Sequence, residues 1–312
     1  MDLEHRIHKL VSSKNSYIHD DCAYLSNTHQ LITTDTLVEN VHFNLKHFNA
    51  YEIAHRLFAC NYSDIQSSGG YPEYALLSIS FPSKNFEISQ QIVKFFKKIL
   101  EKYNIRLIGG DTTSSSKIYL SSTFISKTIK KIKVINRKNA KVGDSIFTSK
   151  NIGFSKLGYL SIFKKLNLNK NLLQKSKDQF LKPKIISYSN LFNRCKINSC
   201  MDISDSLHSS LKELSRQSKK KFHIDDLKEV SPLLFKNFDP NKYFSLVLSS
   251  GEEFVPVFTA KLTEQDIKLF KLNRIHVIKI GTVHKGQGVV FTELKNFKNN
   301  TFNHFKNKYL NL

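Results

Sequence analysis

Acidic residues are scarce in this chain of 312 residues, which has 26 Asp and Glu against 48 Lys and Arg and a formal net charge of +22. A chain this basic could bind nucleic acid. The lysines, however, are interleaved with Asn, Ile and Ser throughout, as in proteins whose whole composition is biased toward these residues, and such lysines form solvated surfaces. We therefore do not expect nucleic acid as a partner, although the charge would favour anionic substrates.

Long apolar runs and paired cysteine motifs are also missing. No run of about 18 apolar residues is present, and the first six residues contain no hydrophobic signal-peptide core, so we expect a cytoplasmic protein without a membrane partner. The cysteines show no C-x-x-C spacing and no histidine pair at zinc-finger distance, which argues against a zinc site and a disulfide framework. We expect reduced, mostly buried thiols at Cys22, Cys60, Cys195 and Cys200.

The glycine-rich nucleotide motifs are absent as well, in a chain with only 11 glycines. There is no G-x-x-x-x-G-K-[ST], which excludes a P-loop, and no G-x-G-x-x-G after a strand, which argues against a Rossmann cofactor site. There is also no G-x-S-x-G nucleophile elbow. The chemistry that remains is acid placed beside Gly, Ser and Thr.

Five short aspartate motifs carry that chemistry. Each follows an apolar, strand-like run or lies in an amphipathic helical stretch, where a fold can gather carboxylates at one site. Gathered carboxylates repel one another, and divalent cations stabilise them, so the motifs predict a Mg²⁺-phosphate site. Taken singly, each motif is weak. Asp111 after Gly109-Gly110 could simply belong to a turn, and Ser204-Asp205 could simply be a helix N-cap. The motifs are Asp20-Asp21, Thr33-Thr34-Asp35, Ser63-Asp64, Gly109-Gly110-Asp111-Thr112-Thr113 and Asp202-Ile203-Ser204-Asp205.

Apolar periodicity predicts alternating strands and helices, and 40% hydrophobic content is enough for the cores of roughly two domains. We expect strands at 30–38, 74–81, 118–129 and 145–148, and helices around 53–60 and 88–103. A turn at 141–144 separates the predicted domains, residues 1–142 and 143–312. In the second half we expect a helical segment at 157–173, a strand into Asp202, a helix from Asp205, and strands at 243–248, 254–258 and 277–283.

The ordered motifs resemble those of the thiamine-monophosphate kinases, a family grouped with aminoimidazole ribonucleotide synthetase, selenophosphate synthetase and the hydrogenase maturation dehydratase. The resemblance runs from about Asp20 to Phe302-Asn303-His304-Phe305. It rests on His19-Asp20-Asp21-Cys22-Ala23, Thr33-Thr34-Asp35-Thr36-Leu37-Val38 with His42-Phe43, Asn61-Tyr62-Ser63-Asp64, Leu107-Ile108-Gly109-Gly110-Asp111-Thr112-Thr113, Ala140-Lys141-Val142-Gly143-Asp144, Asp202-Ile203-Ser204-Asp205 and Ser250-Gly251-Glu252-Glu253-Phe254.

This resemblance implies ATP-dependent phosphorylation of thiamine monophosphate to thiamine diphosphate on a two-domain α/β (α+β) fold. The fold would have an N-terminal mixed sheet with helices, which forms a homodimer, and a C-terminal α/β domain. Several Mg²⁺ ions would be held by Asp21, Thr33, Thr34, Asp35, Asp64, Asp111, Asp202 and Asp205, of which Asp64, Asp111 and Asp205 would be catalytic. ATP would contact Tyr103, Gly110, Asp111, Arg137 and Ser204, and the thiamine substrate would contact His42, Glu252 and Phe302.

Physical chemistry supports the same reaction independently. The second pKa of a phosphate monoester is about 6, so such an acceptor is ionised at neutral pH and needs no general base. The obstacle is repulsion between two anions, which metal ions held by carboxylates offset. We therefore expect direct in-line transfer without a covalent enzyme intermediate.

The chain departs from the family pattern at four positions, where it has His19, Ser114, Ser206 and Glu253 in place of Gly, Arg, Gly and Asp. Two alternatives also stay open. One is another ATP-dependent enzyme of the superfamily, which a cysteine in the N-terminal glycine-rich loop or at the C-terminus would favour; the sequence shows neither. The other is a basic, non-catalytic binding protein.

Overall fold

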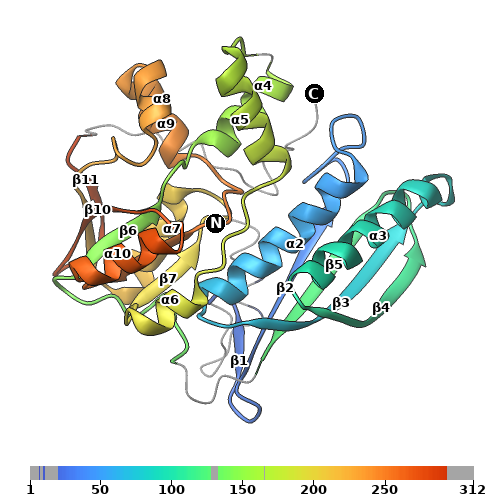
Figure 1. Ribbon diagram of the computed structural model, residues 1–312, viewed down its shortest axis with the longest axis horizontal. Helices are drawn as coiled ribbons and strands as arrows, with labels where there is room; N and C mark the ends of the chain where they lie inside the picture. The colour runs from blue at the N-terminus through green and yellow to red at the C-terminus, as the bar shows by residue number, and fades with distance from the viewer. Residues whose placement is uncertain (1–6, 8–9, 11–19, 128–132, 165, 294–312) are drawn as a thin grey trace.

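The computed structural model describes residues 7, 10, 20–127, 133–164 and 166–293, and its elements form two sheets with helices packed around them (Figure 1). The α/β fold predicted from the sequence is thereby confirmed. One sheet comes from the first half of the chain and the other from the second half. Helix α2 (Ala50–Ser67) lies between them.

The N-terminal sheet has five strands in the order β1-β2-β5-β3-β4. Among its described strands, β3 and β4 pair in parallel and the other neighbours are antiparallel. Helices α2 and α3 (Phe86–Lys102) cover one face, where alternate strand residues such as Leu31, Leu77 and Phe124 are buried. The strands are β1 (Ala23–Leu25), β2 (Gln30–Val38), β3 (Pro72–Phe81), β4 (Arg106–Ser114) and β5 (Tyr119–Ser126).

The other face of this sheet is open and rich in small polar side chains. In the strand register, Ser121 of β5 lies between Thr36 of β2 and Ser78 of β3, and Ser78 pairs with Asp111 of β4. These four side chains therefore form one row across the sheet, all of them exposed or half-buried. Helices α2 and α3 pack on the opposite face.

The second sheet has six strands in the order β11-β8-β10-β6-β9-β7. Its strands are β6 (Ser145–Ser149), β7 (Ser199–Asp202), β8 (Lys221–Ile224), β9 (Pro256–Ala260), β10 (Val277–His284) and β11 (Gly288–Phe291). Its helices are α4 (Phe154–Phe163), α5 (Lys170–Leu181), α6 (Ser189–Arg194), α7 (Leu207–Ser218), α8 (Pro232–Asn237), α9 (Pro240–Leu248) and α10 (Glu264–Leu272).

Two predictions about elements need correction. The strand expected at 243–248 is helix α9, because Asp239 caps its N-terminus, accepting from the Lys242 N–H at 3.1 Å, and Pro240 starts it. The helical segment expected at 157–173 is two helices, α4 and α5. The simpler alternative for Gly109 to Thr113, a turn, is also wrong, because these residues continue strand β4. Gly110 has a φ of 154°, and a Cβ there would lie 1.7 Å from the Leu77 carbonyl oxygen, so this glycine permits strand pairing.

Helix α2 is buried on almost every side because both halves of the chain pack against it. Its apolar residues face the N-terminal core, whereas buried polar residues face the second half. The Gln66 carbonyl Oε1 accepts from the Tyr188 and Ser189 N–H groups at 2.8 and 2.9 Å, and Tyr62 bonds Ser187 at 2.6 Å. These satisfied polar contacts fix the two halves against each other.

Other expectations concern single features. The four cysteines are free and buried, as predicted. Across the described ranges, no helix is long and apolar enough to cross a membrane. The predicted boundary between residues 142 and 143 falls between the two sheets, but Phe180 of α5 packs into the N-terminal core. The boundary therefore stays a prediction.

Candidate active site

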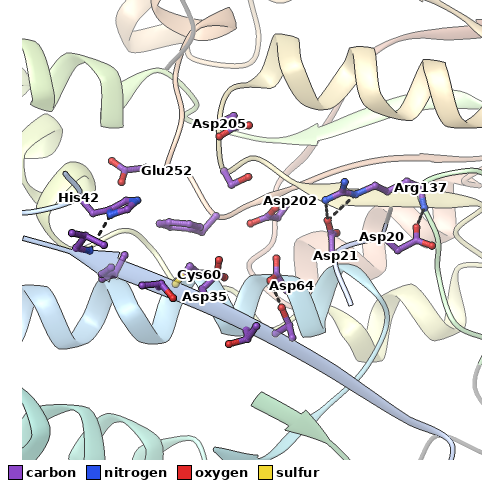
Figure 2. Close-up of a pocket in the computed structure, with 17 residues that line it drawn as sticks. Asp20, Asp21, Asp35, His42, Cys60, Asp64, Arg137, Asp202, Asp205 and Glu252 are labelled. Carbon is purple, nitrogen blue, oxygen red and sulfur yellow. Dashed lines mark hydrogen bonds and ion pairs between the residues drawn. The ribbon is translucent and has the colours of Figure 1, made fainter. Parts of the chain in front are cut away.

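A cavity of about 540 Å³ opens between β2, α2 and two loops of the second half (Figure 2). One loop follows β7, and the other precedes β9. Most of the side chains predicted from the sequence meet here, although they come from segments far apart in the chain. The lining residues are Asp20, Asp21, Thr33, Thr34, Asp35, Thr36, Leu37, Val38, His42, Cys60, Asp64, Arg137, Asp202, Ser204, Asp205, Glu252 and Phe254.

Three carboxylates form the centre of the site. Asp21 precedes β1, Asp64 lies on α2, and Asp202 ends β7, and one oxygen from each lies within 4.8 Å of the others. Burial and mutual repulsion raise the pKa of Asp64 and Asp202 well above the usual range. A divalent cation would remove this repulsion, and oxygen donors are what Mg²⁺ prefers. The donor set therefore fits a Mg²⁺ site.

Hydroxyl groups orient two of these acids. Thr33 of β2 donates to Oδ2 of Asp64 at 2.6 Å, and Ser63 donates to Oδ2 of Asp202 at 2.6 Å. Ser63 is adjacent to Asp64 on α2, so this helix carries one of the acids and donates a hydrogen bond to another. Each bond leaves the second carboxylate oxygen available for a cation.

Arg137 sits at the edge of the acidic cluster. Its guanidinium pairs with Oδ1 of Asp21 at 2.5 Å, and its backbone N–H donates to Asp20 at 2.7 Å. The Asp21 charge raises the pKa of Arg137, which keeps the guanidinium charged despite its burial. Arg137 therefore fixes Asp21 and lines the cavity at the same time.

The two loops of the second half interlock. The Glu252 N–H donates to the Ser204 carbonyl at 2.5 Å, and the Phe254 N–H donates to the Ile203 carbonyl at 3.1 Å. A Cβ on Gly251 would lie 2.3 Å from the Asp205 carbonyl oxygen, so only glycine allows this approach. The contact holds Asp205, which follows β7, at a fixed position relative to Glu252.

Glu252 and Phe254 both have left-handed backbones, with φ of 54° and 49°. Such conformations are unfavourable for residues other than glycine and persist where neighbouring contacts enforce them. The enforcing residue is Glu253, which is buried and accepts from the N–H groups of Gly153 and Ser155 at 2.8 and 3.2 Å. Ser250 and Gln179 also donate to its carboxylate. The backbone turns so that Glu252 and Phe254 line the cavity on either side of this anchor.

His42 and Glu252 lie at the opposite end of the cavity from the acidic cluster, as Figure 2 shows. The backbone N–H of Val38 donates to Nδ1 of His42 at 3.0 Å. The neutral imidazole therefore carries its proton on Nε2. Glu252 pairs with Arg56, a side chain of α2 that is only 1% exposed.

Four predicted site residues do not line this cavity. Gly110 and Asp111 lie on β4, three strands from β2, which corresponds to roughly 14 Å at the usual strand spacing. Tyr103 packs against Phe58 and Tyr62, with ring centroids 4.8 and 5.1 Å away. Phe302 lies outside the described residues. The roles predicted for these four stay predictions.

Several residues that the structure brings to the site had no role predicted from the sequence. Asp20 was part of a motif but received no role, and Phe254 and Cys60 had no signal beyond their neighbours. Arg56 had none at all, since a single arginine in a helix is indistinguishable from a surface residue. The alternative N-cap proposed for Ser204-Asp205 is wrong, because the cap of α7 is Ser206, whose Oγ accepts from the Ser209 N–H at 3.1 Å.

Comparison with known proteins agrees with this architecture. Residues 19–128 match the family described as AIR synthase related protein, N-terminal domain, and residues 141–293 match AIR synthase related protein, C-terminal domain. The chain is thus an AIR synthase related protein. The chain is 35% identical to the thiamine-monophosphate kinase of Buchnera aphidicola subsp. Schizaphis graminum, with 92% of each chain covered. It belongs to the thiamine-monophosphate kinase family, which confirms the resemblance inferred from the motifs.

Further relatives agree. The thiamine-monophosphate kinase of Leptospira interrogans is 33% identical, again with 92% of each chain covered. Among solved structures, AaThiL complexed with AMPPCP and TMP superposes with a TM-score of 0.83 at 26% identity, covering 97% of this chain and 96% of the other. The thiamine monophosphate kinase of Aquifex aeolicus gives a TM-score of 0.79 at 25% identity, covering 93% and 95%.

Proposed function

We propose that this protein transfers the γ-phosphoryl group of ATP to thiamine monophosphate and releases thiamine diphosphate and ADP. The observation that carries the proposal is the cluster of Asp21, Asp64 and Asp202, buried at one end of a cavity whose other end has His42 and Glu252. The relatives named above carry this activity in their names, and the AaThiL structure contains AMPPCP and TMP. A site with concentrated acid at one end suits metal-bound phosphates there and an organic group at the other.

The acceptor phosphate supplies the nucleophile. Its oxygen is ionised at neutral pH because the second pKa of a monoester is about 6, so no side chain needs to remove a proton. Bound Mg²⁺ would offset the repulsion between the two phosphate groups and the charge that develops during transfer. The roles of the protein are to hold the metal, to align the phosphates and to exclude water from the cavity.

Individual roles follow from position in the cavity. Asp21, Asp64 and Asp202 would bind Mg²⁺ directly. The surrounding cavity residues Thr33, Thr34, Asp35 and Asp205 would complete the metal site. Arg137 and Ser204, which line the cavity beside these acids, would contact the phosphates of ATP. His42 and Glu252 would contact the thiamine end of the acceptor. The supporting observation is that all of them line one continuous cavity.

We also propose a homodimer formed through the N-terminal sheets of the two subunits. Two strand edges are unpaired among the described residues. One is the outer edge of β4, and the other is the part of β2 that follows Ile32, beyond its pairing with β1. Two copies related by a twofold axis could pair β4 of each with β2 of the other and so satisfy both edges. Ile108 of β4, 54% exposed in the single chain, would then be covered.

This dimer would also give Asp111 its predicted role. Within one chain Asp111 is three strands away from Thr33 and Asp35. Beside the free edge of β2, Asp111 of the partner subunit would lie next to Thr34 and Thr36, which share its face of the sheet in the strand register and line the cavity, with Gly110 of the partner subunit next to it. We propose a cytoplasmic location, since the reaction consumes ATP.

The test is ADP release with four acceptors at matched concentration and Mg²⁺: thiamine monophosphate, thiamine, an aminoimidazole precursor and none. We expect release with thiamine monophosphate only, because the alcohol of thiamine would need a general base, and the aspartates that line the described cavity are proposed here to bind the metal. Comparable release with thiamine would overturn the acceptor assignment. Release with the aminoimidazole precursor alone would favour another enzyme of the superfamily.

A further inference from the structure

The Arg56 side chain lies in a closed compartment directly behind Glu252. It leaves α2 and enters a space between two aromatic rings, with its guanidinium carbon 5.2 Å from the centre of the Phe48 ring and 5.1 Å from that of Phe180. One terminal nitrogen donates to the Phe180 carbonyl oxygen at 2.5 Å. The other pairs with Oε1 of Glu252. Arg56 thereby joins α2, α5 and the loop before β9.

Burial of this cation is unfavourable unless its ion pair and hydrogen bonds offset the hydration that it loses. The side chain is 1% exposed, and its Nε has no hydrogen-bond partner among the described residues. A buried ion pair generally stabilises a fold no better than apolar side chains of the same volume. Stability alone therefore poorly explains an arginine at this position. Its one contact with the cavity is Glu252, whose side chain is 18% exposed.

The ion pair with Arg56 leaves one carboxylate oxygen of Glu252 available to a ligand. Oε1 is bonded to Arg56, whereas Oε2 has no hydrogen-bond partner among the described residues. The charge of the carboxylate is largely balanced by the guanidinium, so the pair attracts a cationic ligand only weakly. What remains is a hydrogen-bond acceptor with a fixed direction, because both the backbone and one oxygen of Glu252 are held.

We propose that Arg56 is a positioning residue that makes Glu252 select acceptors carrying an amino group on their heteroaromatic ring. The inference rests on the proposed function and specifies how that site recognises its acceptor. An exocyclic N–H of the ring would donate to Oε2, and Phe254 beside it offers an aromatic face for the ring. A substrate analogue with a carbonyl oxygen in place of the amino group would place two hydrogen-bond-accepting oxygens, its own and Oε2 of Glu252, against each other. It would therefore bind more weakly.

The experiment compares two acceptors, thiamine monophosphate and its analogue in which a carbonyl oxygen replaces the ring amino group. For the wild-type chain we expect KM for the analogue to be about ten- to a hundredfold higher, with kcat changed much less. In Arg56→Met this preference should fall to within about threefold, while KM for ATP stays within about threefold. Glu252→Gln should lose the preference too, and the double variant should be no worse than either single one.

Tyr62→Phe is the matched control, because Tyr62 is on the same helix and bonds Ser187 of the second half without touching Glu252. It should keep the wild-type preference even if it is less stable. If Arg56→Met does not fold, Arg56→Lys replaces it. Its ammonium keeps the buried charge but cannot span Phe180 and Glu252 as the guanidinium fork does, so the preference should still fall.

The outcomes separate the two proposals. A wild-type chain that phosphorylates neither acceptor would overturn the proposed function. A wild-type chain that uses both equally, or an Arg56 variant that keeps the full preference, would overturn only the role of Arg56.

Discussion

Thr33 donates its hydroxyl to Oδ2 of Asp64 at 2.6 Å, and this bond joins strand β2 to helix α2 inside the acidic cluster. Its acceptor is a carboxylate whose pKa is raised by burial and by neighbouring acids, and the bond acts in the opposite direction by stabilising the ionised form. Thr33 thus favours the charged state that a metal ligand requires.

Substitutions of Asp64 and Thr33 should separate the effect of losing a metal ligand from the effect of losing the hydrogen bond to that ligand. We expect Asp64→Asn to lower turnover by roughly a hundredfold or more, because it removes a charge that would hold Mg²⁺ at the transferring phosphate. Thr33→Val should lower it by about tenfold, the usual effect of one lost hydrogen bond to a charged group, whereas Thr33→Ser should be close to wild type. Rates come from ADP release at saturating substrates.

Stability should respond to the same variants in a different way. Without Mg²⁺, Asp64→Asn should melt no lower than wild type, since it removes repulsion. Added Mg²⁺ should raise the Tm of wild type and raise that of Asp64→Asn much less. Asp178→Asn, an exposed acid on α5, is the control and should behave as wild type in both assays. A near wild-type rate for Asp64→Asn would contradict the metal-ligand assignment.

Subunit mixing can test the role of Asp111. If Asp111 of the partner subunit completes each site, then Asp64→Ala and Asp111→Ala homodimers are both inactive, but a mixed dimer has one intact site. Random exchange of equal amounts should restore roughly a quarter of wild-type activity. Unfolding and refolding the two variants together provides the exchange, and separate refolding is the control. No recovery would place Asp111 outside the partner's site, and a wild-type rate for Asp111→Ala would remove it from catalysis.

Glu253 predicts a pH dependence of stability. Burial raises the pKa of its carboxyl from 4.5 to about 7 in the folded chain. The folded state therefore binds the proton more tightly, and the contribution to stability is complete below about pH 4.5 and is lost as pH rises to about 7. The loss is roughly 3 kcal/mol, from about 1.4 kcal/mol per pKa unit.

Glu253→Gln should remove this dependence, because its amide cannot titrate and can donate to Gln179 after that amide rotates by a half turn. Urea unfolding at about pH 5 and about pH 8 should show a loss of stability that is roughly 2 to 3 kcal/mol larger for wild type than for the variant. Equal losses would show that the Glu253 pKa is not raised in the folded chain.

The basic composition gives a further prediction. If the charge of +22 reflects compositional bias, duplex DNA at physiological salt should bind no more tightly than the non-specific range, about 10⁻⁴ to 10⁻⁶ M. Fluorescence anisotropy with two unrelated duplexes measures this. Sequence-selective nanomolar binding would favour the alternative of a basic binding protein.

The sequence predicted those parts of the site that depend on local motifs. Asp21, Asp64 and Asp202 each stand in a short acidic motif beside a recognisable strand or helix, so their convergence could be expected. Arg56 could not, because its partners Phe180 and Glu252 are 124 and 196 residues away along the chain and nothing local distinguishes it.

Two interpretations of secondary structure were wrong, for different physical reasons. Residues 243–248 are almost uniformly apolar and buried, and such a run has no period that separates a strand from a helix. The deciding feature was Asp239-Pro240, which starts a helix. At Gly109-Gly110 the glycines suggested a turn, but their lack of a side chain serves the close approach of β4 to β3.

Helix α2 carries both Arg56, behind the acceptor end of the cavity, and Asp64, in the acidic cluster, eight residues later. At the helical rise, this spacing corresponds to about 12 Å and a little over two turns. The distance between the metal site and the residue that orients Glu252 is therefore set by the number of residues between them. One inserted residue in this stretch would turn Asp64 by about 100° relative to Arg56, so α2 should tolerate substitutions between them far better than insertions or deletions.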